Sequence, residues 1–444
     1  MKRITVMFFG SGTSTPDYIK SGFFYLASLV LLVGQFSCSP ARHVTKQVND
    51  LSSKFAHHSA FVLVDPHDGK LLVNVNGEKY FTPASNTKIL TLFAGLSVLG
   101  DSVPAFYYRK TADSLIISGS GDPSFLYSGT YTTPHALNFL KSFPGQIYLS
   151  PRIPTPEKLG PGWAWDDYDQ GYQPERSEFP IYGNLLTIQN QNPSWKVMPA
   201  YFKDSISQKS ESNPYWRKQS DNHFYASAQT TPSTVRRIPF LTSLDRAARL
   251  LSDTLKKSVI VLSKPIPTEN KFYATPSDSL YKTMMQKSDN GIAEQLLMMV
   301  ADRLSDSLNA EAAIQRILQH ELAQLPQKPI WVDGSGLSRY NQITPLAVVE
   351  VWKKILTKRT LEQLLPLLAA SGRNGTLQSM STSTRPFVFG KTGTLSNNYS
   401  LSGYLFTNKD RLLIFSSMNA NFTVSARKVR DELERILTYI HEHY

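Results

Sequence analysis

Cysteine is almost absent from this sequence, because Cys38 is the only one among 444 residues. A single cysteine excludes an intrachain disulfide and any metal site built from several thiolates. The 9 histidines form no H-E-x-x-H pattern, and two of them, His441 and His443, lie at the end of the chain. We therefore expect neither a metal site nor a cofactor.

Charged residues are also scarce, at 18% of the chain, and no run of five or more basic residues occurs. Lys and Arg still outnumber Asp and Glu by 47 to 35, which gives a formal net charge of +12. Without an Arg-rich arm or a zinc-finger spacing, this excess indicates a solvated basic surface and argues against nucleic-acid binding. The 41% of hydrophobic residues suffice for a sizeable core, and the length predicts two or more domains.

An uncharged apolar run of 15 residues, 22–36, follows three Lys or Arg residues near the start of the chain. It is too short to span a membrane comfortably and is typical of a secretory signal peptide. Cys38 lies closely after this run, which is also the position of the lipid-modified cysteine in bacterial lipoproteins. We expect residues 1–37 to be a signal peptide and the protein to be periplasmic, with a lipid anchor at Cys38. Ordinary cleavage without lipid is the alternative.

The mature chain opens with two short β-prone runs, 59–64 and 71–75, on either side of a turn-rich loop, which predicts a hairpin. Residues 85–99 predict a helix that is apolar nearly all round, as expected for a helix inside a large core. From residue 291 an amphipathic helix is expected. The end of the chain predicts three strands and a last helix.

The middle of the chain, from about residue 105 to 270, changes to short strand-like pieces with many Pro, Ser and aromatic residues. This texture predicts one or two inserted, mostly β modules, with Trp163 and Trp165 expected in a module core. The opening hairpin and the closing strands need partners for their apolar faces, so we expect them to share one sheet of a split domain. The predicted organisation is a signal peptide 1–37, a first domain part 38–105, an insertion 106–270 and a second domain part 271–444.

Three short motifs stand at element boundaries: Ser85-Asn86-Thr87-Lys88, Ser288-Asp289-Asn290 and Lys391-Thr392-Gly393. This combination is the known signature of penicillin-binding proteins and class A β-lactamases. S-x-x-K also occurs at 279–282 and 425–428, and S-D-N at 220–222. The copy at 425–428 lies on the expected amphipathic last helix, where Lys is an ordinary solvated residue, and the copy at 220–222 lies in a polar stretch with nothing apolar to position it. Any one motif alone would be explained as well by a helix cap at Ser85 or a surface lysine. Three motifs in the required order favour a catalytic site.

The residue types suit acyl transfer. Ser85 and Lys88 lie on one face of a helix, and apolar surroundings would lower the pKa of the amine enough for it to act as a base. Ser85 is then the nucleophile, and its backbone N–H and that of Thr394 can form an oxyanion hole. Ser288 could relay a proton to the leaving amine, and Asn290 could hold a substrate amide.

The third motif is expected to bind substrate. Lys391 and Thr392 would hold a terminal carboxylate by charge and hydrogen bond. Gly393 would let the substrate backbone approach the strand closely.

On these motifs the sequence resembles the D-alanyl-D-alanine carboxypeptidase/endopeptidase family, the low-molecular-mass class C penicillin-binding proteins. Other matching segments are Gly119–Pro123, Trp165–Asp167, Tyr182-Gly183, Ala293–Leu296 and Asp333–Ser338. The resemblance implies an α+β transpeptidase domain, β-lactamase-like, whose antiparallel sheet has helices on both faces and which is split by inserted β domains. It also implies cleavage of the terminal D-Ala from peptidoglycan stem peptides, often with cutting of D-Ala cross-links, and β-lactams as inhibitors. The turn 333–338 is expected to support the site.

Two alternatives remain at this stage. A β-lactamase or related serine esterase would use the same nucleophile, and its Y-x-N element would match Tyr182-Gly183-Asn184. A catalytically silent wall-binding scaffold would be expected to lack the serine or lysine of a motif, and this sequence keeps both.

Overall fold

The computed structural model describes residues 39–444 except 131–132, 192–194, 209–214, 228–234 and 382–384. The predicted signal peptide and Cys38 therefore lie outside the described residues. Among the helices of the described part, none has both the length and the apolar character needed to cross a membrane.

Strands predominate in the middle of the described chain, and a run of helices from α6 to α10 follows. The α-helices are α2 Pro40–Lys54, α3 Lys88–Val98, α4 His135–Ser142, α5 Leu244–Leu255, α6 Ser277–Lys287, α7 Asn290–Ser305, α8 Ala310–Gln319, α9 Pro345–Leu356, α10 Leu361–Leu364 and α11 Ala426–His443. The strands are β1 His58–Val64, β2 Leu71–Val75, β3 Ser102–Lys110, β4 Ser114–Gly119, β5 Gln146–Ser150, β6 Leu185–Asn190, β7 Trp195–Met198, β8 Ile206–Gln208, β9 Tyr215–Arg217, β10 Phe224–Ala226, β11 Val235–Pro239, β12 Val259–Val261, β13 Asn270–Pro276, β14 Ala369–Ala370, β15 Val388–Leu395, β16 Asn398–Phe406 and β17 Leu412–Ala420.

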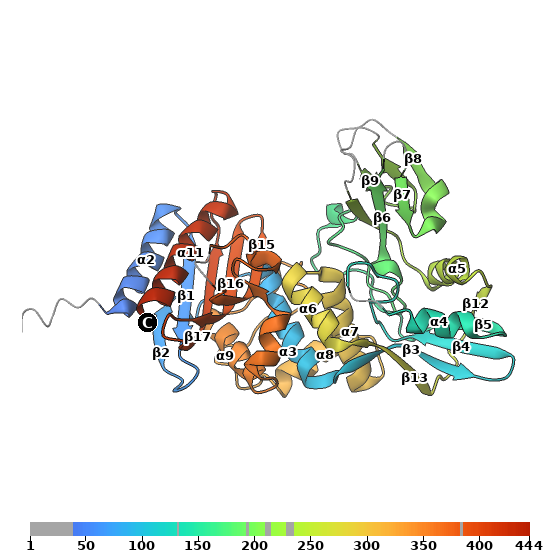
Figure 1. Cartoon of the computed structure of the whole chain (residues 1–444), viewed down its shortest axis with the longest axis horizontal. Helices are drawn as coiled ribbons and strands as arrows, with labels where there is room; N and C mark the ends of the chain where they lie inside the picture. Colours follow the sequence, from blue (N-terminus) through green and yellow to red (C-terminus); the bar gives the residue numbers. More distant parts are fainter. Residues whose placement is uncertain (1–38, 131–132, 192–194, 209–214, 228–234, 382–384) are drawn as a thin grey trace, which may run out of the picture. The chain divides into compact units, whose positions relative to one another are not determined.

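The largest sheet joins the two ends of the chain. Its order is β14-β15-β16-β17-β1-β2, and each neighbouring pair is antiparallel. The predicted hairpin β1–β2 thus pairs with the closing strands through β1 and β17 (Figure 1). The prediction that both ends of the chain share one sheet is confirmed.

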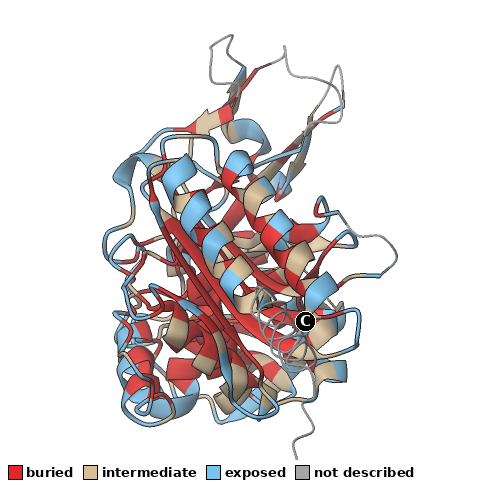
Figure 2. Cartoon of the chain, turned by 90° about the vertical axis from the view of Figure 1, so that its left-hand side faces the viewer, coloured by how far each residue is buried: buried red, intermediate tan, exposed pale blue. Residues whose placement is uncertain are grey.

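Helices cover both faces of this sheet. On one face the Tyr404 hydroxyl of β16 donates to the carbonyl of Trp352 in α9 at 3.0 Å. On the other face the Arg430 guanidinium of α11 lies 5.7 Å from the ring centre of Tyr399. Figure 2 shows the strands buried along most of their length, while the covering helices carry exposed residues on their outer side. The predicted α+β fold with helices on both faces is confirmed.

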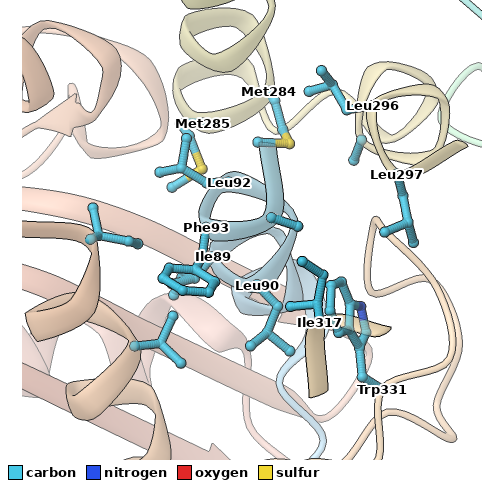
Figure 3. Packing of buried hydrophobic residues seen from close by; sticks show 14 of the residues in the cluster. Ile89, Leu90, Leu92, Phe93, Met284, Met285, Leu296, Leu297, Ile317 and Trp331 are labelled. Carbon is cyan, nitrogen blue, oxygen red and sulfur yellow. The ribbon is translucent and has the colours of Figure 1, made fainter. Parts of the chain in front are cut away.

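Helix α3 lies in the main hydrophobic core, as its sequence predicts. Its apolar residues pack among side chains from α6, α7 and α8 (Figure 3). Helix α7 differs from the prediction, because it is buried on every side from Ile292 to Asp302 instead of being amphipathic. The reason is its central place, since α3, α6 and α8 all pack against it.

The middle of the chain forms a second hydrophobic cluster of its own, with Phe106, Leu149 and Leu251 among its members. It contains a five-stranded sheet of order β12-β5-β4-β3-β13 and two three-stranded sheets, β8-β10-β9 and β11-β6-β7. Strands β3 and β13 pair antiparallel, so the chain enters and leaves this region side by side. The predicted boundaries at 105 and 270 lie within these two strands and stay predictions.

Candidate active site

Ser85 lies in a short 3-10 helix, Ala84–Thr87, that leads directly into α3. Ala84 has φ +50°, in the left-handed region that alanine rarely adopts. Two contacts hold this turn: the Thr87 hydroxyl donates to the Ala84 carbonyl at 2.9 Å, and Gly336 approaches so closely that a Cβ there would lie 1.9 Å from the same oxygen. The N-cap positions are Pro83 and Thr87, so Ser85 is not the helix cap of the alternative interpretation.

Lys88, one turn further on, is completely buried and its amine contacts three oxygens. Its Nζ lies 2.9 Å from Ser85 Oγ, 2.6 Å from Asn290 Oδ1 and 2.6 Å from the Ser335 carbonyl. These contacts bring the first two motifs and the turn 333–338 to one atom. The predicted pairing of Ser85 with Lys88 is present, and the amine has a fixed direction.

Burial lowers the pKa of Lys88 to about 8, although the nearby charges of Asp333, Glu294 and Asp289 act in the opposite direction. The sequence predicted this direction and this cause. At pH 7, one unit below this pKa, about a tenth of the amine is neutral, which is the form that a general base requires.

The second motif lies between α6 and α7. Ser288 ends α6 in the left-handed region, with φ 59°, and Asp289 caps α7 by accepting from the Ile292 N–H at 2.9 Å. The Tyr127 hydroxyl donates to the other oxygen of Asp289 at 2.6 Å. Asn290 donates through Nδ2 to the Tyr172 carbonyl at 2.9 Å, which turns its oxygen toward Lys88.

Asn290 therefore contacts Lys88, whereas the sequence predicted a contact with a substrate amide. Ser288 is half-buried, and among the described residues its hydroxyl has no hydrogen-bond partner. Ser288 and Asn290 line a cavity of about 670 Å³ whose wall includes Tyr172, Lys287 and Arg237. This cavity leaves room for a ligand beside Asn290, whose side-chain oxygen contacts Lys88.

The third motif lies within β15, and two contacts hold this strand and β16 to the turn that carries Ser85. Asn86 donates through Nδ2 to the Lys391 carbonyl at 2.9 Å and accepts through Oδ1 from the Ser402 hydroxyl at 2.6 Å. Gly393 faces the same turn, because a Cβ there would lie 2.5 Å from the Pro83 carbonyl oxygen and 3.0 Å from the Asn86 nitrogen. The structure thus gives a reason for the glycine other than the predicted approach of substrate: the turn that carries Ser85 already fills this space.

Lys391 is completely buried, and its Nζ donates to the Thr392 carbonyl at 2.7 Å. Burial and the neighbouring charge of Lys88 hold its pKa well below the ordinary value. The Thr392 hydroxyl donates to Thr376 Oγ1 at 2.7 Å, whereas Thr394 is exposed. The two residues predicted to bind the carboxylate, Lys391 and Thr392, are therefore both buried.

One edge of β15 is open along this motif. Strand β14 pairs with β15 only at Phe389 and Gly390, and among the described residues no other strand covers that edge from 391 to 395. An open edge presents unpaired backbone N–H and C=O groups to which an extended peptide can add.

The turn 333–338 supports the site, as predicted. Asp333 accepts from the backbone N–H groups of Gly336 and Ser338, each at 2.7 Å. It also accepts from the indole N–H of Trp163 at 3.0 Å. The prediction that Trp163 and Trp165 form a module core is wrong, because Trp163 reaches this turn and Trp165 is 73% exposed.

The Y-x-N element of the alternative interpretation is a structural part of the inserted region. Asn184 is buried, and its Nδ2 donates to the Glu175 carbonyl and to Ser177 Oγ, each at 2.9 Å. Its Oδ1 accepts from the backbone N–H of Ile181. The amide is thus occupied within its own segment.

Several residues that contact the motif residues are not specified by any motif. No role was predicted from the sequence for Thr376 or for Asn86, which occupies a variable position of the S-x-x-K motif. The Ser335 carbonyl was also missed, because a backbone acceptor has no sequence signature.

Comparisons with known proteins agree with this geometry. The sequence matches the D-Ala-D-Ala carboxypeptidase 3 (S13) family over residues 42–231 and 241–440. The D-alanyl-D-alanine carboxypeptidase DacB of Haemophilus influenzae is 24% identical over 441 residues, covering 86% of this chain and 90% of the relative. The carboxypeptidase DacB of Mycolicibacterium smegmatis is 30% identical over 170 residues, which are 35% of this chain and 36% of the relative.

A solved structure has the same fold. Penicillin binding protein 4 of Haemophilus influenzae superposes with a TM-score of 0.72 at 22% identity, covering 89% of this chain and 99% of the other. The family match spans most of the chain on both sides of a short gap. The chain therefore belongs to the D-Ala-D-Ala carboxypeptidase 3 (S13) family of serine-type D-Ala-D-Ala carboxypeptidases.

Proposed function

We propose that Ser85 is the nucleophile of this carboxypeptidase and attacks the carbonyl carbon of the D-Ala-D-Ala bond at the end of a peptidoglycan stem peptide. The observation that carries the assignment is the set of three contacts of Lys88 Nζ. The Ser335 carbonyl and the amide oxygen of Asn290 can only accept hydrogen bonds. A neutral amine has two N–H groups for these acceptors, and its lone pair then points toward the hydroxyl of Ser85.

The reaction follows from this arrangement. As the bond from Ser85 Oγ to the carbonyl carbon forms, the hydroxyl proton passes to Lys88 Nζ. The carbon–nitrogen bond then breaks, and the nitrogen leaves with a proton from Lys88, directly or through the unpartnered hydroxyl of Ser288. In the second half of the reaction a water attacks the acyl carbon and gives a proton to the same amine. Lys88 then returns this proton to Ser85 Oγ as the ester bond breaks.

The substrate peptide adds to the open edge of β15 at residues 391–395. Its terminal carboxylate contacts Lys391 and the hydroxyls of Thr392 and Thr394, and an anion there also favours the charged form of Lys391. The backbone N–H groups of Ser85 and Thr394 stabilise the oxyanion.

We also propose that β-lactams acylate Ser85 and that the enzyme cuts D-Ala cross-links as an endopeptidase. Penicillin binding protein 4 of Haemophilus influenzae has been solved in complex with a β-lactam, and the likeness in fold supports the first part. A β-lactam presents a reactive amide and a carboxylate, which suit Ser85 and Lys391. The cavity beside Asn290 offers room for the longer cross-linked peptide.

Mass spectrometry of the protein after incubation with benzylpenicillin tests the nucleophile. We expect one covalent adduct on the peptide that contains Ser85, lost slowly, and none in Ser85→Ala. Fast multiple-turnover hydrolysis of the β-lactam would indicate a β-lactamase, and no adduct would indicate a silent scaffold. With a defined cross-linked muropeptide, release of D-Ala with loss of the cross-link indicates both peptidase activities.

For the location of the protein, we propose export to the periplasm and a lipid anchor at Cys38. The support is the apolar run 22–36 and the position of the single cysteine after it. Intact-mass analysis of the membrane-extracted protein should show a lipid-modified N-terminus at Cys38. An unmodified N-terminus downstream of Cys38 would rule out the anchor.

A further inference from the structure

A chain of buried contacts connects the inserted region to the catalytic lysine. Arg176 of the inserted region donates through Nε and Nη2 to Glu294 Oε2 of α7, at 2.9 and 2.5 Å. The other oxygen of Glu294 accepts from the backbone N–H of Ser335 at 2.7 Å. The Ser335 carbonyl in turn accepts from Lys88 Nζ at 2.6 Å.

This series of contacts, from Arg176 through Glu294 and Ser335 to Lys88, has little freedom to rearrange. The side chains of Arg176 and Glu294 are only 7% and 1% exposed. Gly334 lies so close to α7 that a Cβ there would come within 2.5 Å of the Ala293 carbonyl oxygen. Glu294 therefore holds the Gly334–Ser335 peptide unit, which directly precedes the Ser335 carbonyl that faces the catalytic amine.

We propose that Glu294, held by Arg176, is a positioning residue for acylation: it aims the Ser335 carbonyl at Lys88 and places a buried negative charge near that amine. The inserted region thereby helps to set the geometry and the protonation of the catalytic base. This inference rests on the proposed roles of Ser85 and Lys88.

The charged groups that face Lys88 come from three elements. They are Glu294 and Asp289 at α7, Asp333 in the turn 333–338, and Lys391 on β15. The charge of Glu294 favours the protonated form of Lys88. Removal of that charge should therefore make the amine lose its proton at a lower pH.

A second buried ion pair provides a matched control. Arg152 of the inserted region pairs with Asp302, and these side chains are 14% and 4% exposed. Asp302 also lies on α7, eight residues after Glu294, which is about 12 Å along the helix axis. Both pairs join the same two regions, but only Glu294 contacts the turn that holds Lys88.

The experiment measures the rate constant of Ser85 acylation by benzylpenicillin from pH 6 to 10 for wild type, Glu294→Gln and Asp302→Asn. Glutamine can still accept from the Ser335 N–H but carries no charge. For Glu294→Gln we expect the rise in rate to move to lower pH and the plateau to fall by about ten- to a hundredfold, the scale of a small misplacement of catalytic groups. For Asp302→Asn we expect the wild-type pH profile and plateau.

Thermal unfolding of both variants separates catalysis from stability. If Glu294→Gln does not fold, the double variant Arg176→Met/Glu294→Gln leaves no unpaired buried charge, and we expect the same shift of its profile. A Glu294→Gln or double-variant profile that matches Asp302→Asn would overturn the proposal. A wild-type protein that is not acylated at Ser85 would instead overturn the proposed function, so the two failures are distinguishable.

Discussion

Two completely buried lysines lie in this site, and their surroundings differ. Lys88 Nζ contacts three oxygens, whereas Lys391 Nζ, among the described residues, contacts only the Thr392 carbonyl. An amine with a full set of partners has a fixed direction and suits proton transfer. An amine with free donors suits a ligand that brings an anion. This difference supports the proposed roles, which are proton transfer for Lys88 and carboxylate binding for Lys391.

The strongest test removes the amine of Lys88. Lys88→Ala should lower the rate of acylation by about 10² to 10⁴, the usual scale for loss of a general base. The rate can be followed with a fluorescent penicillin on a variant shown by circular dichroism to be folded. Acylation near the wild-type rate, with Ser85→Ala still inactive, would mean that the base is another residue.

The pH dependence of acylation should report Lys88. Below its pKa of about 8 the amine is protonated and cannot accept the proton of Ser85, so the rate should rise with pH through about 8. At pH 6, two units lower, about a hundredth of the amine is neutral, and the rate should be about a hundredfold below the plateau. A rate that is flat between pH 6 and 9 would contradict the assignment.

Lys391→Met should affect recognition of the terminal carboxylate. A hydrogen bond to a charged group contributes about 1.5 to 3 kcal/mol, so kcat/KM for an acyl-D-Ala-D-Ala peptide should fall by about 10- to 150-fold. The matching peptide with a C-terminal amide should lose much less. Equal losses for both peptides would mean that Lys391 does not bind the carboxylate.

The smallest of these effects is expected for Asn290→Ala, which removes one of the two acceptors of the neutral Lys88 amine and leaves the Ser335 carbonyl. A neutral hydrogen bond contributes about 0.5 to 1.5 kcal/mol, so the acylation rate should fall by about two- to tenfold. Stopped-flow acylation measures this loss, with Asn222→Ala in the other S-D-N copy as a control that leaves the rate unchanged. A loss as large as that of Lys88→Ala would mean that Asn290 has a further role.

The sequence predicts the residues of the catalytic motifs better than the residues that hold those motifs in place. Ser85, Lys88 and Asn290 stand in motifs with known spacing, and the structure brings them to one atom. Glu294 could be seen only as part of a family segment, because its partners Arg176 and the Ser335 N–H are distant in sequence. No local pattern encodes such a pairing.

The secondary structure likewise divides into elements that the sequence predicts and elements that it does not. Strands β1, β2, β16 and β17 follow from runs of apolar residues, and so does the buried helix α3. The strands β8, β9 and β10 of the inserted region are so short that no alternation of apolar and polar residues can be recognised in their sequences. The burial of α7 on all sides depends on three neighbouring helices, and a single helix cannot reveal its neighbours.

The pairing of β3 with β13 has an evolutionary consequence. Because the two ends of the inserted region are hydrogen-bonded neighbours, residues can be gained or lost between them while the surrounding core keeps its connection. Such a segment is free to diverge in length and sequence as long as a few anchor points are kept. In this chain Arg176 is such an anchor, so grafting a foreign module at the β3–β13 junction would require an equivalent partner for Glu294.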